Sequence, residues 1–256
     1  MLMILSPAKT IDDKIINKPK LGSENLPFSN ETNVLIDILK EFSVDELSKL
    51  MKISDKLAIL NYDRFRKFYD EDTKDFTAIL AFKGEAYRGL AAKDFSEDDF
   101  LYSQNVLRIL SGLYGVIKPI DRIKEYRLEM GTKLKNNIGK DLYEFWDDKI
   151  TNNIEKAIED SYGDKVLINL ASKEYSTSID MDRIKRKYDV INISFLENRE
   201  GQYKLIGTYA KKARGMMVRY IIKNKIDTVE GIKEFDEECY QYNEYLSSED
   251  NLVFTR

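Results

Sequence analysis

A strongly basic segment near the carboxyl end of the sequence is the clearest candidate for binding chemistry. It covers residues 201–226 and contains no Asp or Glu, although the whole chain has a net charge of only −4. Its positive charges are Lys204, Lys211, Lys212, Arg214, Arg219, Lys223 and Lys225. Residues 227–256, by contrast, are strongly acidic. Such a basic segment can bind a polyanion, or it can form a solvated helix face that keeps the protein in solution.

Loops that contain lysine follow three short apolar runs of strand length. The runs cover residues 1–5, 77–82 and 165–170, and the loops after them contain Ser6, Lys9 and Thr10, then Lys83 and Glu85, then Lys173 and Glu174. Continuous apolar runs separated by helices are typical of parallel strands that are buried on both faces. Because the loops at the carboxyl ends of parallel strands line a shared crevice, we expect Lys9, Lys83 and Lys173 to converge on one cleft.

A cleft of this kind could support two kinds of chemistry. Its ammonium groups could bind the phosphate of a nucleotide, a sugar phosphate or a nucleic acid. Alternatively, crowding of like charges could lower the pKa of one lysine and make it a nucleophile. The catalytic candidates are then the three lysines, with Glu85, Glu174 or a tyrosine as proton carrier. Three tyrosines near these loops could stack on bases or simply pack at the edge of the core: Tyr87, Tyr114 and Tyr175.

A glycine-containing break in residues 107–120 is the second candidate for phosphate binding. We expect a helix from Ser96 to about residue 110, a break at residues 111–115, and then a basic continuation. This pattern resembles a helix-hairpin-helix element, which presents backbone amides and a helix N-terminus to a phosphate. The contacts would come from Gly112, Tyr114, Gly115 and Lys118. The usual hairpin has Gly-x-Gly spacing, so an ordinary helix that ends at glycine is the alternative.

The composition excludes several classes of site. The chain has no histidine and one cysteine, Cys239, which excludes Ser-His-Asp and Cys-His catalysis, His-ligated metals and an internal disulfide. No phosphate-binding P-loop or dinucleotide fingerprint is present. We therefore expect no metal and no cofactor. The first residues lack a basic region and a long apolar run, so we expect a cytoplasmic protein with no membrane partner.

The remaining patterns predict a mixed α/β fold in one compact domain, residues 1–256, with a central, mainly parallel sheet flanked by helices and a basic cleft. Helical spacing covers residues 31–42, 43–51, 54–69 and 141–162, and a helix begins at about Ala210. A β-hairpin is expected over residues 188–195 and 202–208. Residues 252–254 would add a last edge strand.

Several long stretches, in this order, resemble the YaaA family of bacterial peroxide stress resistance proteins. They include MLMILSPAKTID, AILAFKGEAYRGL, LRILSGLYGVIKPID, VLINLASKEY and YAKKARGMMVRYIIKNK. The resemblance covers nearly the whole chain. It implies a single-domain α/β fold that binds duplex or branched DNA through a positively charged cleft containing a helix-hairpin-helix element. It also implies a role in helping the cell to survive hydrogen peroxide, with less free intracellular iron and less oxidative DNA damage. No reaction is assigned to the family.

The resemblance also places the expected site. By position, the hairpin is residues 111–116, and the cleft draws on Lys9, Lys83, Lys173, Lys211, Lys212 and Arg214. We expect a non-enzymatic protein that binds DNA largely without regard to base sequence, and we favour a monomer as its oligomeric state. Its effect on intracellular iron would be indirect. The alternative is an enzyme acting on a small phosphorylated or nucleotide-like substrate. A third possibility is a stress adaptor whose acidic tail contacts a partner.

Overall fold

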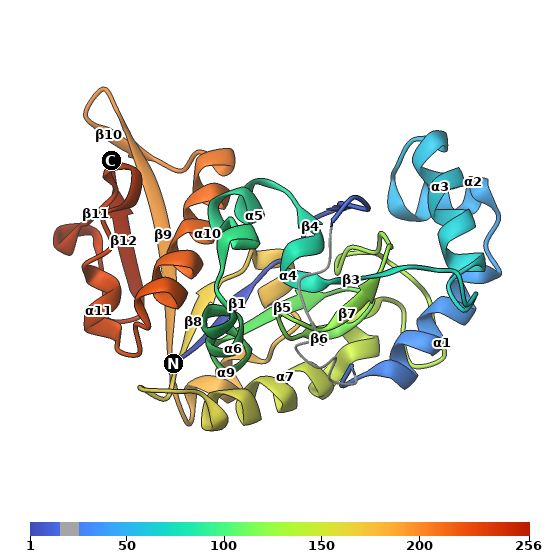
Figure 1. Ribbon diagram of the computed structural model, residues 1–256, viewed down its shortest axis with the longest axis horizontal. Helices are drawn as coiled ribbons and strands as arrows, with labels where there is room; N and C mark the ends of the chain where they lie inside the picture. Colours follow the sequence, from blue (N-terminus) through green and yellow to red (C-terminus); the bar gives the residue numbers. More distant parts are fainter. Residues whose placement is uncertain (16–25) are drawn as a thin grey trace.

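The computed structural model describes residues 1–15 and 26–256 and contains a central sheet flanked by helices (Figure 1). From β12 to β5 the neighbouring strands pair in parallel, whereas β11, β6 and β10 pair antiparallel at the margins. The strand order is β11 (Gln241–Tyr242), β12 (Asn251–Thr255), β9 (Asp189–Arg199), β8 (Val166–Leu170), β1 (Leu2–Leu5), β5 (Leu107–Ser111) and β6 (Gly115–Ile117), and β10 (Gln202–Lys204) pairs with β9. The expected mixed α/β fold with a mainly parallel sheet is confirmed.

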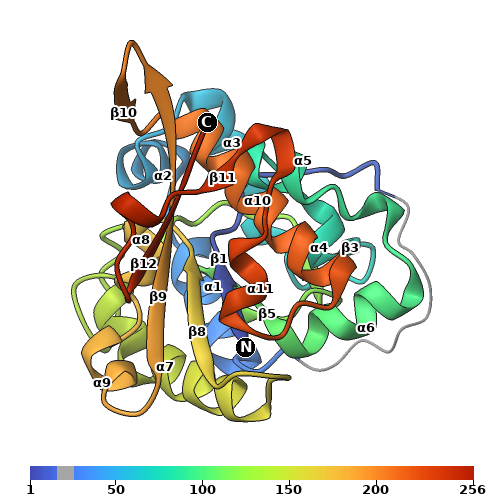
Figure 2. The same ribbon diagram turned by 90° about the vertical axis from the view of Figure 1, so that its left-hand side faces the viewer.

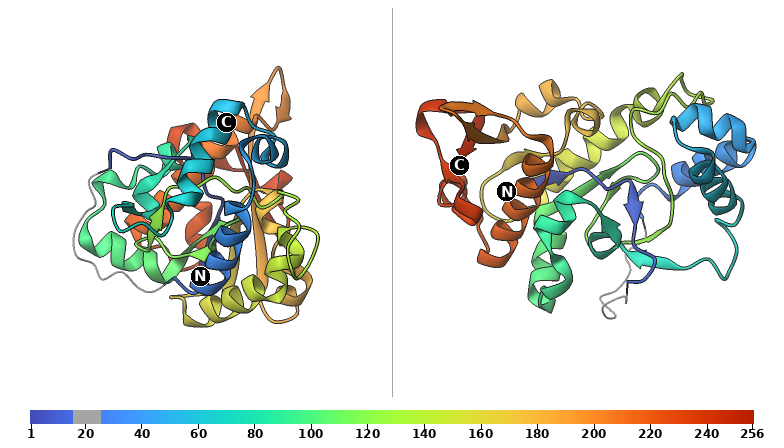
Figure 3. Two further views of the ribbon diagram at one scale, coloured as in Figure 1. Left: turned by 90° about the vertical axis from the view of Figure 1, so that its right-hand side faces the viewer. Right: turned by 90° about the horizontal axis from the view of Figure 1, so that it is seen from above.

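Helices cover both faces of this sheet, which explains why its central strands are apolar throughout. Figure 2 shows α10 (Gly207–Asn224) and α6 (Glu97–Val106) on one side, and α7 (Leu142–Asp160) and α9 (Met181–Lys185) on the other. A group of three helices lies at one end of the molecule (Figure 3): α1 (Ser29–Lys40), α2 (Val44–Met51) and α3 (Asp55–Arg66). The shorter helices are α4 (Ala78–Ala81), α5 (Glu85–Leu90), α8 (Lys173–Ser176) and α11 (Val229–Lys233).

Local signals in the sequence set many of these boundaries. Capping boxes begin α2 at Ser43 and α6 at Ser96. In each box the serine hydroxyl accepts a backbone N–H from three residues later, and the backbone N–H of the serine donates to the acidic side chain of that residue. The expected hairpin is β9–β10, and its turn contains Gly201 at φ +82°. Strand β12 forms as expected but is not the edge, because β11 pairs on its outer side.

The apolar run of residues 77–82 is not the third parallel strand that we expected. It ends β3 (Asp75–Thr77), turns through α4 and begins β4 (Phe82–Lys83). The first amides of α4 are satisfied from outside the helix, since Ala78 N–H donates to Asp121 O (2.9 Å) and Ile79 N–H to Pro119 O (2.9 Å). A short apolar run does not distinguish a strand from a buried helical turn. Strand β3 pairs with β7 (Arg122–Lys124) outside the central sheet.

Candidate functional site

Two of the three expected loops meet at the carboxyl edge of the sheet. Strands β1 and β8 are parallel neighbours with Leu5 opposite Leu170, so the loops that follow them leave the sheet side by side. The Ser172 N–H donates to Ser6 Oγ (2.8 Å), and the two serine hydroxyls lie 3.3 Å apart. The predicted meeting of the first and third loops is therefore confirmed.

Lys83 reaches the same place by a different route from the one we expected. Strand β2 (Thr10–Ile11) leaves the first loop and pairs antiparallel with β4, with Thr10 opposite Lys83. A separate two-stranded ribbon, rather than a third parallel strand, thus sets Lys83 beside the loop that contains Lys9. Convergence of these two lysines is confirmed, although the topology behind the prediction was wrong.

A cavity of about 280 Å³ lies where these loops meet. Lys173 is not a lining residue, although its neighbours Ser172 and Glu174 are, so the structure does not bring it into this cavity with Lys9 and Lys83 as expected. Ser6, Thr10 and Tyr87 form part of the wall. The charged lining residues are Lys9, Lys83, Glu85, Glu129, Glu174, Lys211 and Arg214. We call this cavity the basic cleft.

Close packing of α10 on α5 brings the last two of these cations into the cleft. A Cβ atom added at Gly215 would lie 1.7 Å from Ala86 O, and one added at Gly89 would lie 2.1 Å from Lys212 O. Glycine at both positions lets the two backbones approach more closely than any side chain would permit. Lys211 and Arg214, one turn apart on α10, therefore line the basic cleft.

The carboxylates of the cleft are already engaged. Glu129 forms ion pairs with Lys9 (2.5 Å) and with Arg127 (3.0 Å). Glu85 pairs with Arg88 (2.7 Å). Glu174 accepts the Gly131 N–H (2.9 Å). The sequence interpretation missed Glu129, because nothing in its local pattern marks it as the partner of a lysine 120 positions earlier.

Three cations of the cleft are not compensated in this way. Within residues 1–15 and 26–256, the side chains of Lys83, Lys211 and Arg214 have no hydrogen-bond or ion-pair partner. Lys83 and Lys211 are exposed, but Arg214 is half-buried. Burial lowers the pKa of Arg214, which remains charged because a guanidinium loses its proton only in strong base. The cleft thus contains an excess of positive charge, because four cations and three carboxylates line it.

The three tyrosines considered for stacking are buried rather than exposed. Tyr87 is buried and its hydroxyl donates to Ser6 O (3.1 Å). Burial raises the pKa of Tyr87 and that of Tyr175, so both phenols are protonated at neutral pH. Tyr114 is also buried, and its hydroxyl accepts the Lys124 N–H (3.0 Å) far from the cleft lining. These contacts favour the core interpretation of the tyrosines.

The expected helix-hairpin-helix element is a buried β-hairpin. Helix α6 ends at Val106, and β5 and β6 pair antiparallel across a turn that contains Gly112 and Tyr114, with Gly115 as the first residue of β6. The Leu113 and Tyr114 amides, which a phosphate would need, both donate to Ser111 Oγ (3.2 and 3.0 Å). The prediction of a helix to about residue 110 was wrong because Leu107 and the residues after it extend the central sheet beside β1.

Trp146 covers this hairpin from α7. Its Nε1–H donates to Gly112 O (3.0 Å), and Gly115 has φ +67° with the indole ring against it. Lys118 lies just beyond, half-buried, where its backbone N–H donates to Asp121 Oδ2 (2.8 Å). It lines a different cavity, of about 260 Å³. None of Gly112, Tyr114, Gly115 or Lys118 lines the basic cleft.

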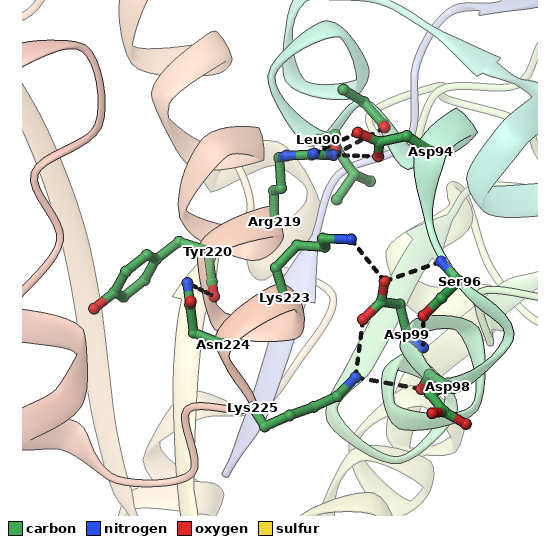
Figure 4. A network of polar contacts seen from close by, with 11 residues as sticks. Leu90, Asp94, Ser96, Asp98, Asp99, Arg219, Tyr220, Lys223, Asn224 and Lys225 are labelled. Atoms are coloured by element: carbon green, nitrogen blue, oxygen red, sulfur yellow. Dashed lines mark hydrogen bonds and ion pairs between the residues drawn. The ribbon is translucent and has the colours of Figure 1, made fainter.

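Acidic residues from elsewhere in the chain neutralise much of the basic segment. Lys212 pairs with Glu238 and does not line the cleft. Figure 4 shows Arg219 in a two-pronged pair with Asp94 (2.6 and 2.7 Å), and Lys223 and Lys225 both on Asp99 (2.9 and 3.0 Å). Burial opposes ionisation of Asp99, but the two ammonium groups and the Ser96 N–H hold its pKa well below the usual range.

The charge separation along the sequence therefore does not become one basic face.

In the described part of the chain, no group of three or more His, Cys, Asp and Glu side chains is arranged to hold a metal ion. Across the same residues, no helix has the length and apolar character needed to cross a membrane.

Comparisons with known proteins agree with the resemblance in the sequence. The family described as "Peroxide stress protein YaaA" matches residues 1–246. A UPF0246 protein of Clostridium botulinum is 46% identical over 256 residues, which is 100% of this chain and 99% of that protein. UPF0246 proteins of Clostridium perfringens (47% over 261 residues, 100% of both chains) and Saccharophagus degradans (45% over 258 residues, 100% and 99%) are similarly related. The chain belongs to the YaaA family of peroxide stress proteins.

Proposed function

We propose that this protein acts in the peroxide stress response by binding phosphate groups of DNA at the basic cleft, largely without regard to base sequence. The observation that supports this most strongly is the set of three uncompensated cations, Lys83, Lys211 and Arg214, on one cavity. The name of the family supports the stress role. Phosphate contacts fix position and affinity but carry no base information, so little sequence preference is expected.

Ion pairs within the protein reduce the number of cations in residues 201–226 that are available to bind DNA. Four of its cations, Lys212, Arg219, Lys223 and Lys225, already have acidic partners. A phosphate would have to displace those carboxylates before it gained any Coulomb energy. Lys211 is a direct neighbour of Lys212 in sequence but faces the cleft without a partner. The two lysines therefore form a matched pair for testing the proposal.

The test is fluorescence anisotropy of a labelled duplex and a four-way junction over a salt series. Lys211→Gln should weaken binding to all DNA sequences alike and reduce the slope of log affinity against log salt by about 1, because one phosphate contact is lost. Lys212→Gln should leave both quantities close to those of the unmodified protein. Equal effects of the two substitutions, or no salt-dependent binding at all, would contradict the proposal.

A second function, catalysis on a small phosphorylated substrate, is favoured by one observation. The cleft is partly enclosed, and Glu85 and Glu174 line it together with the cations. Phosphorus NMR of a mononucleotide incubated with the protein would distinguish the two functions. New phosphorus signals that disappear with Glu85→Gln or Glu174→Gln would establish turnover, whereas an unchanged spectrum would leave binding alone.

We also propose that any effect on intracellular iron is indirect. The sequence has no histidine and one cysteine, so a tight iron site would need a cluster of carboxylates. Isothermal calorimetry with Fe(II) under anaerobic conditions tests this, and a stoichiometric site of micromolar affinity would contradict it.

A further inference from the structure

The cations of the basic cleft differ in how exposed their side chains are to solvent. The Lys9 side chain is 63% exposed, and Lys83 and Lys211 are also exposed. Arg214, which lines the same cavity, is half-buried. A phosphate lying across the mouth would reach the lysines. Only a phosphate that enters the cavity would reach the guanidinium of Arg214.

The size of the cavity limits what can enter. The volume of about 280 Å³ is just below the range of roughly 300–1,000 Å³ that is typical of small-ligand pockets. That volume suits one phosphate with part of its sugar. In an intact duplex each backbone phosphate continues into a nucleotide on both sides, so it cannot be inserted singly. A phosphate at the end of a strand continues on one side only.

The charge of the cleft points to the same kind of group. The carboxylates Glu85, Glu129 and Glu174 already have partners, which leaves Lys83, Lys211 and Arg214 uncompensated. A phosphate monoester carries a charge of about −1.5 to −2 at pH 7 and has three free oxygens, whereas an internal diester carries −1. The planar guanidinium of Arg214 can bind two of those oxygens at once.

We propose that the cleft receives the phosphate at the end of a DNA strand, the kind of end that a strand break leaves, with Arg214 on the inserted phosphate and Lys83 and Lys211 on the oxygens nearer the mouth. This inference rests on the proposed DNA binding and makes it more specific. Intact duplex contacts only the outer lysines and binds more weakly. The protein thereby distinguishes broken DNA from intact DNA without reading bases.

The experiment compares DNA molecules of one sequence that differ only at the end. A hairpin duplex is prepared with a 5′-phosphate, a 3′-phosphate or hydroxyls alone at its single open end, and a dumbbell of the same sequence is closed at both ends. Each competes with a labelled duplex for the full-length protein at physiological salt. We expect at least a tenfold preference for one or both phosphorylated ends over the hydroxyl end and the dumbbell.

Three variants connect that preference to the cleft. Arg214→Gln should weaken binding of the phosphate-ended hairpins at least fivefold more than binding of the dumbbell, and so remove the end preference. Lys211→Gln should weaken binding to every molecule. Lys204→Gln, which removes an exposed lysine outside the cleft lining, should change nothing. Urea denaturation of each variant shows whether the fold is retained.

A measurement on the unmodified protein keeps the test decisive if Arg214→Gln fails to fold. A nucleoside 5′-monophosphate should displace the phosphate-ended hairpin at least tenfold more effectively than the corresponding nucleoside. Equal affinity for all four DNA molecules, or equal displacement by nucleotide and nucleoside, would overturn the inference while leaving DNA binding intact. Failure of every DNA to bind would overturn the proposed function as well.

Discussion

Replacement of Gly215 by alanine should destabilise the protein, although alanine normally favours a helix. In the interior of a helix, alanine is better than glycine by roughly 0.5–1 kcal/mol. Here the added Cβ would lie 1.7 Å from Ala86 O and 2.8 Å from Leu90 N. Both atoms belong to the backbone of α5 and cannot rotate away. The two helices would have to separate by more than about 1 Å to reach an ordinary contact.

The balance of these two effects gives the expected magnitude. Overpacking of a close contact costs about 1–3 kcal/mol. Because the clash at Gly215 is with backbone, we expect the upper part of that range, and a net loss of about 1–2 kcal/mol in the free energy of unfolding remains after the gain in helix propensity. Separation of α10 from α5 would also move Lys211 and Arg214 out of the cleft, so DNA affinity should fall in parallel.

Urea denaturation measures the first effect, and the salt-dependent anisotropy assay measures the second. Gly207→Ala is the matched control, because Gly207 begins the same helix and nothing lies within 4 Å of an added Cβ. That variant should be as stable as the unmodified protein or slightly more stable. If Gly215→Ala unfolded at the same urea concentration or a higher one, with an unchanged m-value, the close packing that positions the cleft cations would not exist as described.

Three further substitutions test other parts of the structure. Asp99→Asn should cost about 1–3 kcal/mol at pH 7. Because the pKa of Asp99 is lowered in the folded state, its stabilisation is full above about pH 4 and is lost progressively as the pH falls towards the folded-state pKa. The urea midpoints of the two proteins should therefore approach each other as the pH is lowered below about 4, and a constant difference would contradict this. Gly115→Ala, at φ +67° and against Trp146, should cost about 1–3 kcal/mol and shift the emission of the single tryptophan; unchanged emission would count against it. Tyr87→Phe should cost about 1 kcal/mol, measured by denaturation, because Ser6 O loses a donor, and a stability equal to that of the unmodified protein would exclude this bond.

Features that depend on a few consecutive residues were predicted well. The helices that begin at residues 43 and 96 and the hairpin that turns at Gly201 formed where they were expected. Their capping boxes and turn satisfy backbone groups within four residues of chain, so the local pattern carries the information. Strands β1 and β8 were recognised as buried apolar runs, and their parallel pairing brought Ser6 and Ser172 together as expected.

Features that depend on a distant partner were not predictable in the same way. Residues 78–81 form a helical turn because Asp121 O and Pro119 O accept its first amides, and those acceptors lie about forty residues later. Residues 107–111 become a strand because β1 offers a free edge beside them. An apolar residue is equally suited to a buried strand and a buried helix until its neighbours are known.

The sequence alone determined that the charges are separated along the chain, that no histidine is present and that the chain resembles one family throughout. Only the tertiary structure decided which charges remain available. It pairs Arg219, Lys223 and Lys225 with acidic residues more than one hundred positions away, and it pairs Lys212 with Glu238 from the acidic tail. It leaves Lys211 and Arg214 facing a cavity. Coulomb energy depends on distance in space rather than on separation along the chain. The number of positive charges therefore follows from the sequence, but their positions in space and their acidic partners do not.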